Sequence, residues 1–417
     1  MLRSIIQKEL LENLFSYKFS IIVILSTILI FVSIFVMYRD YSLALENYEV
    51  LQPKSSEPIA IIPPTPLSIF AKGLNENLCR SHEITFGGQI KVGSKQQSVN
   101  NLFRLFTTPD LLYIIKVILS LCAILFTFDM VCGEKEAGTL RLSMSNSLKR
   151  PILIIGKWIG GFTSFILPFL MAVLLGTVFI TLSPLIQMNA QHWTKLVIFL
   201  VSSIIYLAVF FSLGLLISCL TYQSSSSLVI SLFIWATLVF LIPNLGNILA
   251  RQLVEIPTVQ QLEIKREQFL IKEAFDLNNQ KQNLTDAVKT INSKNDKLVA
   301  DYRNRYNRLI NISQNITRFS PTAAFTYLAT DLMGTGITEE RKLKQAVLQY
   351  KNLVSNNRNP MDFMGKKDIH FPAFIFQGPS TIEVLFAGGL SNLVIIIIFN
   401  MLFFASAYIA FLRYDVR

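Results

Sequence analysis

The chain has 417 residues, of which 52% are hydrophobic and only 16% are charged. Soluble domains typically carry about 25% charged residues, so an ordinary soluble enzyme is not expected. The formal net charge of +11 would suit a nucleic-acid partner, but we expect none, because the short segments beside the apolar runs carry basic residues in the way that membrane proteins do.

The first 18 residues form an amphipathic stretch in which several apolar side chains can share one face. This pattern predicts a helix over residues 1–18 that lies in the membrane interface. The apolar run that follows, at residues 19–37, has no small-residue cleavage site, so we expect it to be a retained anchor and not a signal peptide. The apolar side chains of the first stretch are Ile5, Ile6, Leu10, Leu14 and Phe15.

Six apolar runs reach or approach the roughly 20 residues that a membrane crossing requires. Backbone polar groups in lipid must be satisfied within the segment, so each run is predicted to be a helix. The sequence therefore predicts an all-α membrane protein with about six transmembrane helices. They are expected at residues 19–37, 111–128, 159–182, 196–220, 228–249 and 384–412. Glycines that could allow close helix approach are Gly160, Gly161, Gly388 and Gly389.

A long polar region at residues 38–109 follows the first expected span. Its proline cluster favours an extended or turning backbone. Cys79 is the only cysteine in either long polar region, so neither region can close on its own disulfide.

Lys116 lies about one and a half turns into the second expected span. Charged side chains within the membrane are costly and often functional. Two interpretations stay open: the ammonium reaches the outer headgroups, or it lines a path for an anionic substrate.

The segment at residues 129–158 carries the most informative pattern of the chain. It contains GEKEAGTLRL at residues 133–142, then Lys149-Arg150-Pro151 and Gly156-Lys157. The alternating charges predict a short helix, and Gly138 permits a close backbone approach. A small apolar face would then be offered to a partner by Thr139, Leu140 and Leu142. The alternative is a merely solvated charged loop.

A second polar region, residues 250–383, is predicted to be mainly helical. Leucine or isoleucine recurs every seven residues, which gives a helix one apolar stripe. We expect a helical hairpin that breaks near Asn292-Ser293-Lys294-Asn295, where turn-forming residues cluster. The hairpin could be a spacer or dimer contact, or it could dock a protein outside the membrane. The heptad positions are Leu270, Leu277, Leu284, Ile291 and Leu298.

Basic residues are frequent in the segments expected to flank the membrane on the side of both termini. The positive-inside rule then predicts that both termini and residues 129–158 are cytoplasmic. Residues 38–109 and 250–383 would lie outside. We expect a multi-pass protein of the plasma membrane, which in a bacterium is the inner membrane.

No sequence motif for catalysis occurs in the chain. The nearest approach to a phosphate-binding loop, residues 88–95, has the wrong residue order after its second glycine. The three histidines are far apart, so no metal site is expected. We therefore predict no catalytic residue and no cofactor bound by this chain.

The GEKEAGTLRL run, with a basic pair and a Gly-Lys entering the next helix, resembles the coupling-helix segment of the type 2 ABC exporter permeases (the ABC-2 family). Two further segments agree with this resemblance. Residues 1–18 resemble the elbow helix of the family, and residues 320–336 resemble the outer domain of a subfamily with large loops after the first and fifth spans.

The resemblance implies a permease subunit that couples hydrolysis by a separate ABC ATPase to outward movement of a lipid-like, peptide or other amphiphilic substrate. ATP and Mg²⁺ would bind that ATPase, and a second permease copy or homologue would complete a dimer within membrane lipid. The implied ATPase-coupling residues are Glu134, Lys135, Glu136, Gly138, Thr139, Leu140 and Leu142. The alternative is an ABC-type mechanotransmitter that acts on a protein outside the membrane without moving a solute.

Overall fold

A computed structural model describes most of the chain. The described residues are 2–51, 58–75, 81–84, 90–93, 109–145, 149–258, 260–262, 264–265, 267–268, 271–272, 284–356 and 372–414. They contain six helical segments that are long and apolar enough to cross a membrane, which confirms the predicted class and number of spans. These segments are Tyr17–Val50, Leu111–Glu136, Arg150–Thr181, Ala190–Leu220, Ser224–Leu253 and Thr381–Arg413.

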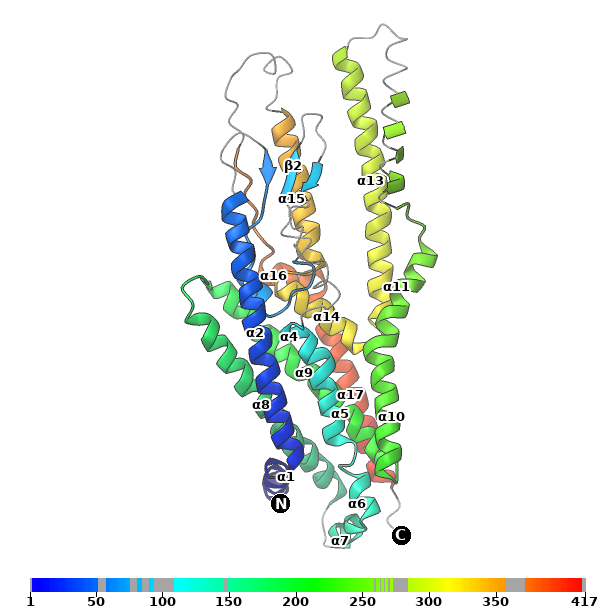
Figure 1. Cartoon of the computed structure of the whole chain (residues 1–417). Coiled ribbons are helices and arrows are strands. Elements are labelled where there is room, and N and C mark those ends of the chain that lie inside the picture. Colours follow the sequence, from blue (N-terminus) through cyan, green and yellow to red (C-terminus); the bar gives the residue numbers. More distant parts are fainter. Residues whose placement is uncertain are drawn as a thin grey trace. The chain divides into compact units, whose positions relative to one another are not determined.

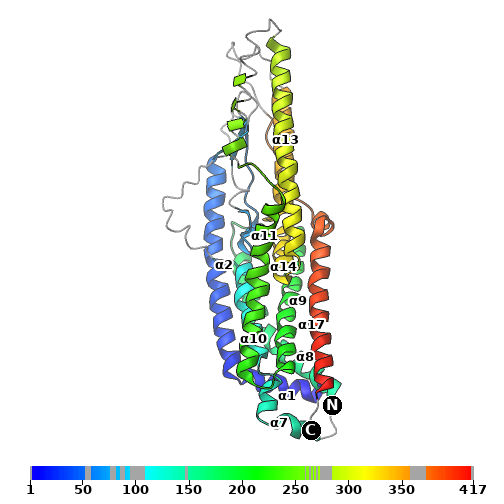
Figure 2. The same ribbon diagram turned by 90° about the vertical axis from the view of Figure 1, so that its right-hand side faces the viewer.

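The chain divides into two compact units, Met1–Ala236 with Ala324–Arg417, and Thr237–Ala323. In the first unit, α1 (Leu2–Leu14) runs across one end of the spans, at the end where both described chain ends lie (Figures 1 and 2). The short helices α6 (Cys132–Glu136) and α7 (Thr139–Ser145) lie at this same end. We call it the terminal end of the first unit.

The first span is longer than its apolar run. Helix α2 covers Tyr17–Leu51, which is 35 residues or about 52 Å at 1.5 Å per residue, whereas the hydrocarbon core is about 30 Å thick. The helix therefore continues beyond residue 37, where the predicted span ends, and is longer than a membrane crossing requires. No glycine or proline occurs between Tyr38 and Leu51, so nothing in the backbone stops the helix where the apolar residues stop.

The centre of the first unit is an aromatic cluster that joins three spans. Phe211 of α9 (Ala190–Leu220) is fully buried. Its ring contacts Phe126 of α5 (Ser120–Thr127) and three rings of α8 (Arg150–Thr181), with centroids 5.3–6.3 Å apart. The α8 rings are those of Trp158, Phe162 and Phe165.

Two spans of the first unit contain a π-helical stretch near the end away from α6. The second span starts with α4 (Leu111–Tyr113), capped by Asp110, and continues as η3 (Ile114–Leu119). The sixth span starts with α16 (Thr381–Val384) and η6 (Leu385–Gly389) before α17 (Leu390–Arg413). Gly388 adopts a φ of 138° inside η6, a conformation that only glycine adopts readily.

Both long polar regions contribute to one small domain at the end of the first unit away from α6 (Figure 1), which we call the outer domain after the side of the membrane that the sequence predicts for it. Strands β1 (Ile59–Ala60), β2 (Ser81–Ile84) and β3 (Ile90–Gly93) form an antiparallel sheet in that order, near the 3-10 turn η1 (Pro66–Ile69). The sheet packs on α15 (Ile337–Asn356), which follows α14 (Pro321–Leu332). The sequence did not predict these strands. Their shared apolar core includes Ala60, Ile62, Ile84, Leu343, Val347, Tyr350 and Val354.

Acidic side chains are buried where this domain meets the fourth and sixth spans. Asp331 accepts hydrogen bonds from the backbone N–H and the hydroxyl of Thr338, both at 3.0 Å. Burial of the Glu339 carboxyl raises its pKa to about 7; the cations Lys195 and Lys342 lower this pKa and Asp331 raises it. Glu339 is 4% exposed, so its proton uptake is linked to folding of the domain.

The second unit is a helical pair with its own contacts. It comprises η4 (Thr237–Leu241), α11 (Ile242–Leu253) and α13 (Leu284–Thr317), and α11 and α13 lie side by side (Figure 2). The hydroxyl of Ser313 bonds Asn247 Oδ1 at 2.5 Å. A Cβ on Gly246 would lie 2.3 Å from the Thr317 side chain, so this glycine is needed for the close approach.

The predicted break at residues 292–295 is wrong, because α13 runs through these residues without interruption. Asparagine, serine and lysine lower helix stability by only a few tenths of a kcal/mol each, and the segment lacks glycine and proline. Of the heptad positions, Leu270 and Leu277 lie outside the described residues.

We predict that the outer domain loses stability as the pH rises. The pKa of Glu339 is about 7 in the folded chain against an ordinary value of 4.5, so its contribution is fully present below about pH 4.5 and is lost as the pH rises through 7. The difference corresponds to roughly 3 kcal/mol. Thermal unfolding in detergent at pH 5 to 8 should show this slope in the wild-type chain and a flatter one in Glu339→Gln.

Glu340→Gln is the matched control, because the neighbouring Glu340 carboxylate forms an ion pair with Lys344 on the same helix. The control should keep the wild-type slope. A wild-type unfolding temperature that does not change between pH 5 and 8 would contradict the assignment.

Candidate functional site

The segment with the GEKEAGTLRL run folds as two short helices joined by a left-handed turn. Ser218 of α9 holds the start of α6, because its hydroxyl accepts hydrogen bonds from the N–H groups of Val131 and Cys132, both at 3.0 Å. Gly138 has a φ of +73° between α6 and α7. A Cβ there would meet nothing within 4 Å, so the backbone conformation, and not space, favours glycine.

Glu134 belongs to a buried ion network. The ammonium of Lys157, on α8, contacts Glu134 Oε1 at 2.8 Å and Glu9 Oε1 of α1 at 2.8 Å. The side chains of Lys157, Glu9 and Glu134 are 4%, 7% and 25% exposed. One cation therefore joins the N-terminal helix, the third span and α6.

Lys135 turns back toward the end of the fourth span. Its ammonium donates to the carbonyl oxygen atoms of Cys219 and Thr221, at 2.5 and 3.0 Å. It also lies over the rings of Tyr414 and Tyr222, 4.5 and 5.3 Å from their centroids. A cation at these carbonyl groups is favoured by the dipole of α9.

Glu136 reaches the start of the fifth span, α10 (Ser224–Ala236). Its Oε2 accepts hydrogen bonds from the N–H of Ser224 at 3.1 Å and from the Ser224 hydroxyl at 2.8 Å. A carboxylate at a helix start satisfies backbone donors that have no partner within the helix. Three successive charges of α6 thus contact three different spans.

Leu140 and Leu142 face opposite ways. Leu140 is 1% exposed and packs with Ile5 of α1, Leu153 of α8 and Phe411 of α17. The expectation that Leu140 offers an apolar face to a partner is therefore corrected, because its side chain packs in the core of this chain. Leu142 is 69% exposed.

An exposed ridge remains on the side of α6 and α7 away from the core. We call it the docking ridge, and its members are Glu136, Ala137, Gly138, Thr139, Arg141 and Leu142. The ridge combines small, apolar and charged groups at the terminal end of the first unit, on a support fixed by the ion network.

Lys116 lies in η3 and is only partly exposed. Its ammonium is 5.8 Å from the Tyr113 ring centroid. Its carbonyl oxygen accepts hydrogen bonds from the hydroxyl groups of Ser120 and Tyr206, at 2.6 and 2.8 Å. The structure separates this residue from the α6–α7 segment along the second span.

Sequence reasoning missed Glu9 and did not assign Lys157 a partner. A signal was present in Gly156-Lys157-Trp158-Ile159-Gly160, where two glycines four residues apart mark a close helix contact beside a lysine. A Cβ on Gly156 would lie 2.6 Å from Ile5, and one on Gly160 would lie 2.8 Å from Glu9. Gly161 likewise lies against Met130 and Phe211, so the predicted close approach at Gly160 and Gly161 is confirmed.

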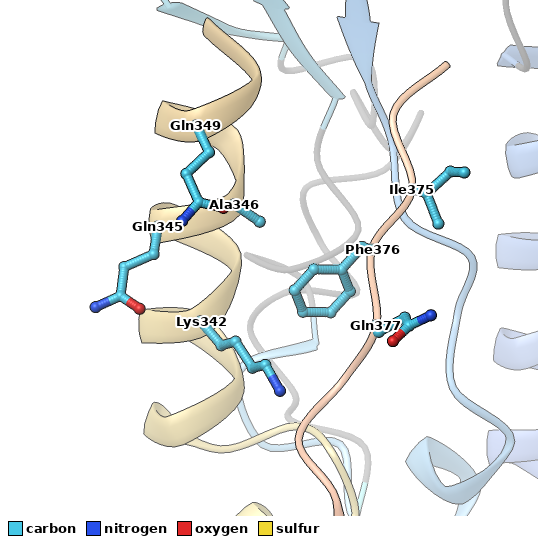
Figure 3. A pocket seen from close by; sticks show the side chains of 7 residues that line it. All are labelled: Lys342, Gln345, Ala346, Gln349, Ile375, Phe376 and Gln377. Carbon is cyan, nitrogen blue, oxygen red and sulfur yellow. The ribbon is translucent and has the colours of Figure 1, made fainter. Parts of the chain in front are cut away.

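A shallow groove lies on the outer domain. Its volume is about 360 Å³, and it lies between α15 and an extended segment (Figure 3). The Phe376 side chain points toward α15, whereas Ile375 points away (Figure 3). Lysine and glutamine side chains dominate the α15 wall: Lys342, Gln345 and Gln349, with Ala346. Within the described residues, no three His, Cys, Asp or Glu side chains are grouped to hold a metal ion.

Comparison with known protein families matches residues 3–416 to the family described as ABC-2 family transporter protein. Comparison with curated protein sequences gives no match. The family match covers α1, the segment with α6 and α7, and all six spans.

We predict that alanine destabilises the chain strongly at one leucine of α7 and hardly at all at the other. Leu140→Ala should destabilise the chain by about 2–5 kcal/mol, because it leaves a cavity in the core. Leu142→Ala should change the free energy of unfolding by less than about 0.5 kcal/mol, because the site is exposed. Thermal unfolding in detergent compares them directly, and equal effects would contradict the inward orientation of Leu140.

Proposed function

Because the chain belongs to the ABC-2 family of transporter proteins, we propose that it is the permease of an exporter whose separate ATPase docks on the docking ridge. The family makes the chain a multi-pass membrane subunit that works with an ABC ATPase subunit. The outward direction, the docking residues and the substrate class are our proposals.

The observation that carries the proposal is the construction of α6 and α7. Glu134, Lys135 and Glu136 contact α8, α9 and α10, respectively. A displacement of the docking ridge would therefore act directly on three spans. The ridge itself presents Leu142 as an apolar anchor among small residues. Interfaces concentrate their binding energy in a few such anchors.

The ATPase would bind ATP and Mg²⁺, since the chain has no phosphate-binding loop. A second copy or a homologue would pair with this permease in the membrane. An amphiphilic substrate, such as a lipid or an apolar peptide, suits an interior built from aromatic rings with few charges. Lys116 could then meet the polar part of such a substrate at the far end of the second span.

The rival function is force transmission to a protein outside the membrane, and the groove along α15 (Figure 3) is the observation that favours it. Both functions use the docking ridge. They differ in whether a solute crosses the membrane when ATP is hydrolysed, which vesicle transport measurements decide.

We predict that Leu142→Asp abolishes capture of the ATPase while the chain folds normally. A carboxylate at an anchor would be buried without a partner in the complex, so recovery of the ATPase in mild detergent should fall at least tenfold. The matched control is Leu353→Asp, because Leu353 is also exposed, at 56%, but lies on α15. Full recovery of the ATPase with Leu142→Asp would refute docking at this ridge.

The orientation is tested by labelling with a membrane-impermeant thiol reagent. Single cysteines at Lys149, beside α7, and at Asn304, on α13, are introduced into a chain whose own four cysteines are replaced. Positive-inside reasoning predicts labelling of intact cells at residue 304 only, and labelling at 149 only after lysis. The reverse pattern would show that the topology is opposite to the prediction and that the docking ridge lies outside the cell.

A further inference from the structure

We propose that Lys157 is a positioning residue with two separate tasks: its pair with Glu9 holds α1 on α8, and its pair with Glu134 passes movement of the docking ridge to α8. This inference rests on the proposed function, because it explains how movement at the ridge enters the membrane.

Burial of Lys157 requires that its ammonium keep at least one anionic partner. Measured over the whole residue, Lys157 is 3% exposed and Glu9 is 5% exposed. A buried ammonium requires a compensating anion, and here it has two, from segments far apart in sequence. Either carboxylate can therefore move away while Lys157 stays paired with the other.

The Glu9 side of the network is fixed by backbone packing. Gly156 and Gly160 flank Lys157 on the face of α8 that meets α1, and both glycines leave room for α1 side chains that a Cβ would displace. At Gly160, the Ile6 carbonyl oxygen would also lie 3.1 Å from such a Cβ. Helix α1 is thus seated on α8 over more than one turn, and Glu9 moves with α8.

The Glu134 side is the more exchangeable contact. Its side chain is 25% exposed, against 7% for Glu9. Its second oxygen, Oε2, is buried without a hydrogen-bond partner in the described part of the chain, so the carboxylate is held through Oε1 and Lys157. Only Lys135, Glu136 and Ala137 separate it from the turn at Gly138. The Glu134–Lys157 contact is therefore close to the docking ridge along the chain, so that a displacement of the ridge would act on this contact before it acts on the Glu9–Lys157 contact.

The two tasks predict that substitution of Glu134 mainly affects stimulation of the ATPase, whereas substitution of Glu9 mainly affects stability. In nanodiscs, ATP hydrolysis by the complex is compared with hydrolysis by the copurifying ATPase alone. Glu134→Gln should reduce the permease-dependent stimulation about tenfold, with unchanged ATPase recovery and unfolding temperature. Glu9→Gln should lower the unfolding temperature and reduce stimulation less than twofold per folded complex. Glu134→Asp, which keeps the charge, should recover part of the stimulation.

The matched control is Asp129→Asn, which removes the partly exposed ion pair between Asp129 and Lys18 near the same end of the first unit. It should retain stimulation. Full stimulation in Glu134→Gln would overturn the coupling task, and so would a loss of ATPase recovery equal to the loss of stimulation, because Glu134 would then be a docking contact. Failure of the wild-type chain to retain any ATPase would overturn the proposed function as well.

Discussion

The ammonium of Lys157, buried at 3% exposure between two carboxylates, is the constraint on which the terminal end of the first unit depends. A cation at such a position is stable only if anions are brought to it. Those anions come from α1 and from α6, so both helices must lie against α8 at one level. Gly156 and Gly160, which flank Lys157, let α1 approach α8 closely enough for Glu9 to reach the Lys157 ammonium.

Once α6 is fixed by Glu134, the rest of the GEKEAGTLRL run follows. Lys135 contacts the carbonyl groups that end α9, Glu136 the donors that start α10, and Leu140 the core between α8 and α17. Glu134, Lys135 and Glu136 thus make contacts within the chain and do not simply form a solvated face. What is left outside is a ridge of small residues with one exposed leucine, which is a surface that another protein can approach closely.

The spans could be predicted from the sequence because an apolar run of about 20 residues has few alternatives to a membrane helix. The length of the first helix could not be predicted, because α2 continues past the apolar run through polar residues that include no helix breaker. For the same reason α13 runs through the predicted break at residues 292–295. The ion network joins residues 148 positions apart, and no local pattern encodes that pairing. Leu140 and Leu142 are too close in sequence to share a helix face, but which of them points inward depends on how α7 packs. The sheet of the outer domain was missed because its strands are short and one of them has only two residues.

Lys157 is also next to the aromatic cluster that joins α8 to α9 and α17. The adjacent residue, Trp158, stacks on Phe162 and contacts Phe211 of α9 and Phe404 of α17, and its indole N–H donates to Ser212, whose hydroxyl bonds Asn400. Close-packed rings transmit displacement because they cannot be compressed. At the other end of the spans, η3 and η6 replace regular helix, and π-helical turns are frequent at functional sites. Under the proposed coupling, a displacement that enters at α6 would pass through the aromatic cluster toward the π-helical segments Ile114–Leu119 and Leu385–Gly389. Lys116 lies in the first of these segments, so the charged residue that the sequence singled out in the second span lies on irregular backbone and not on regular α-helix.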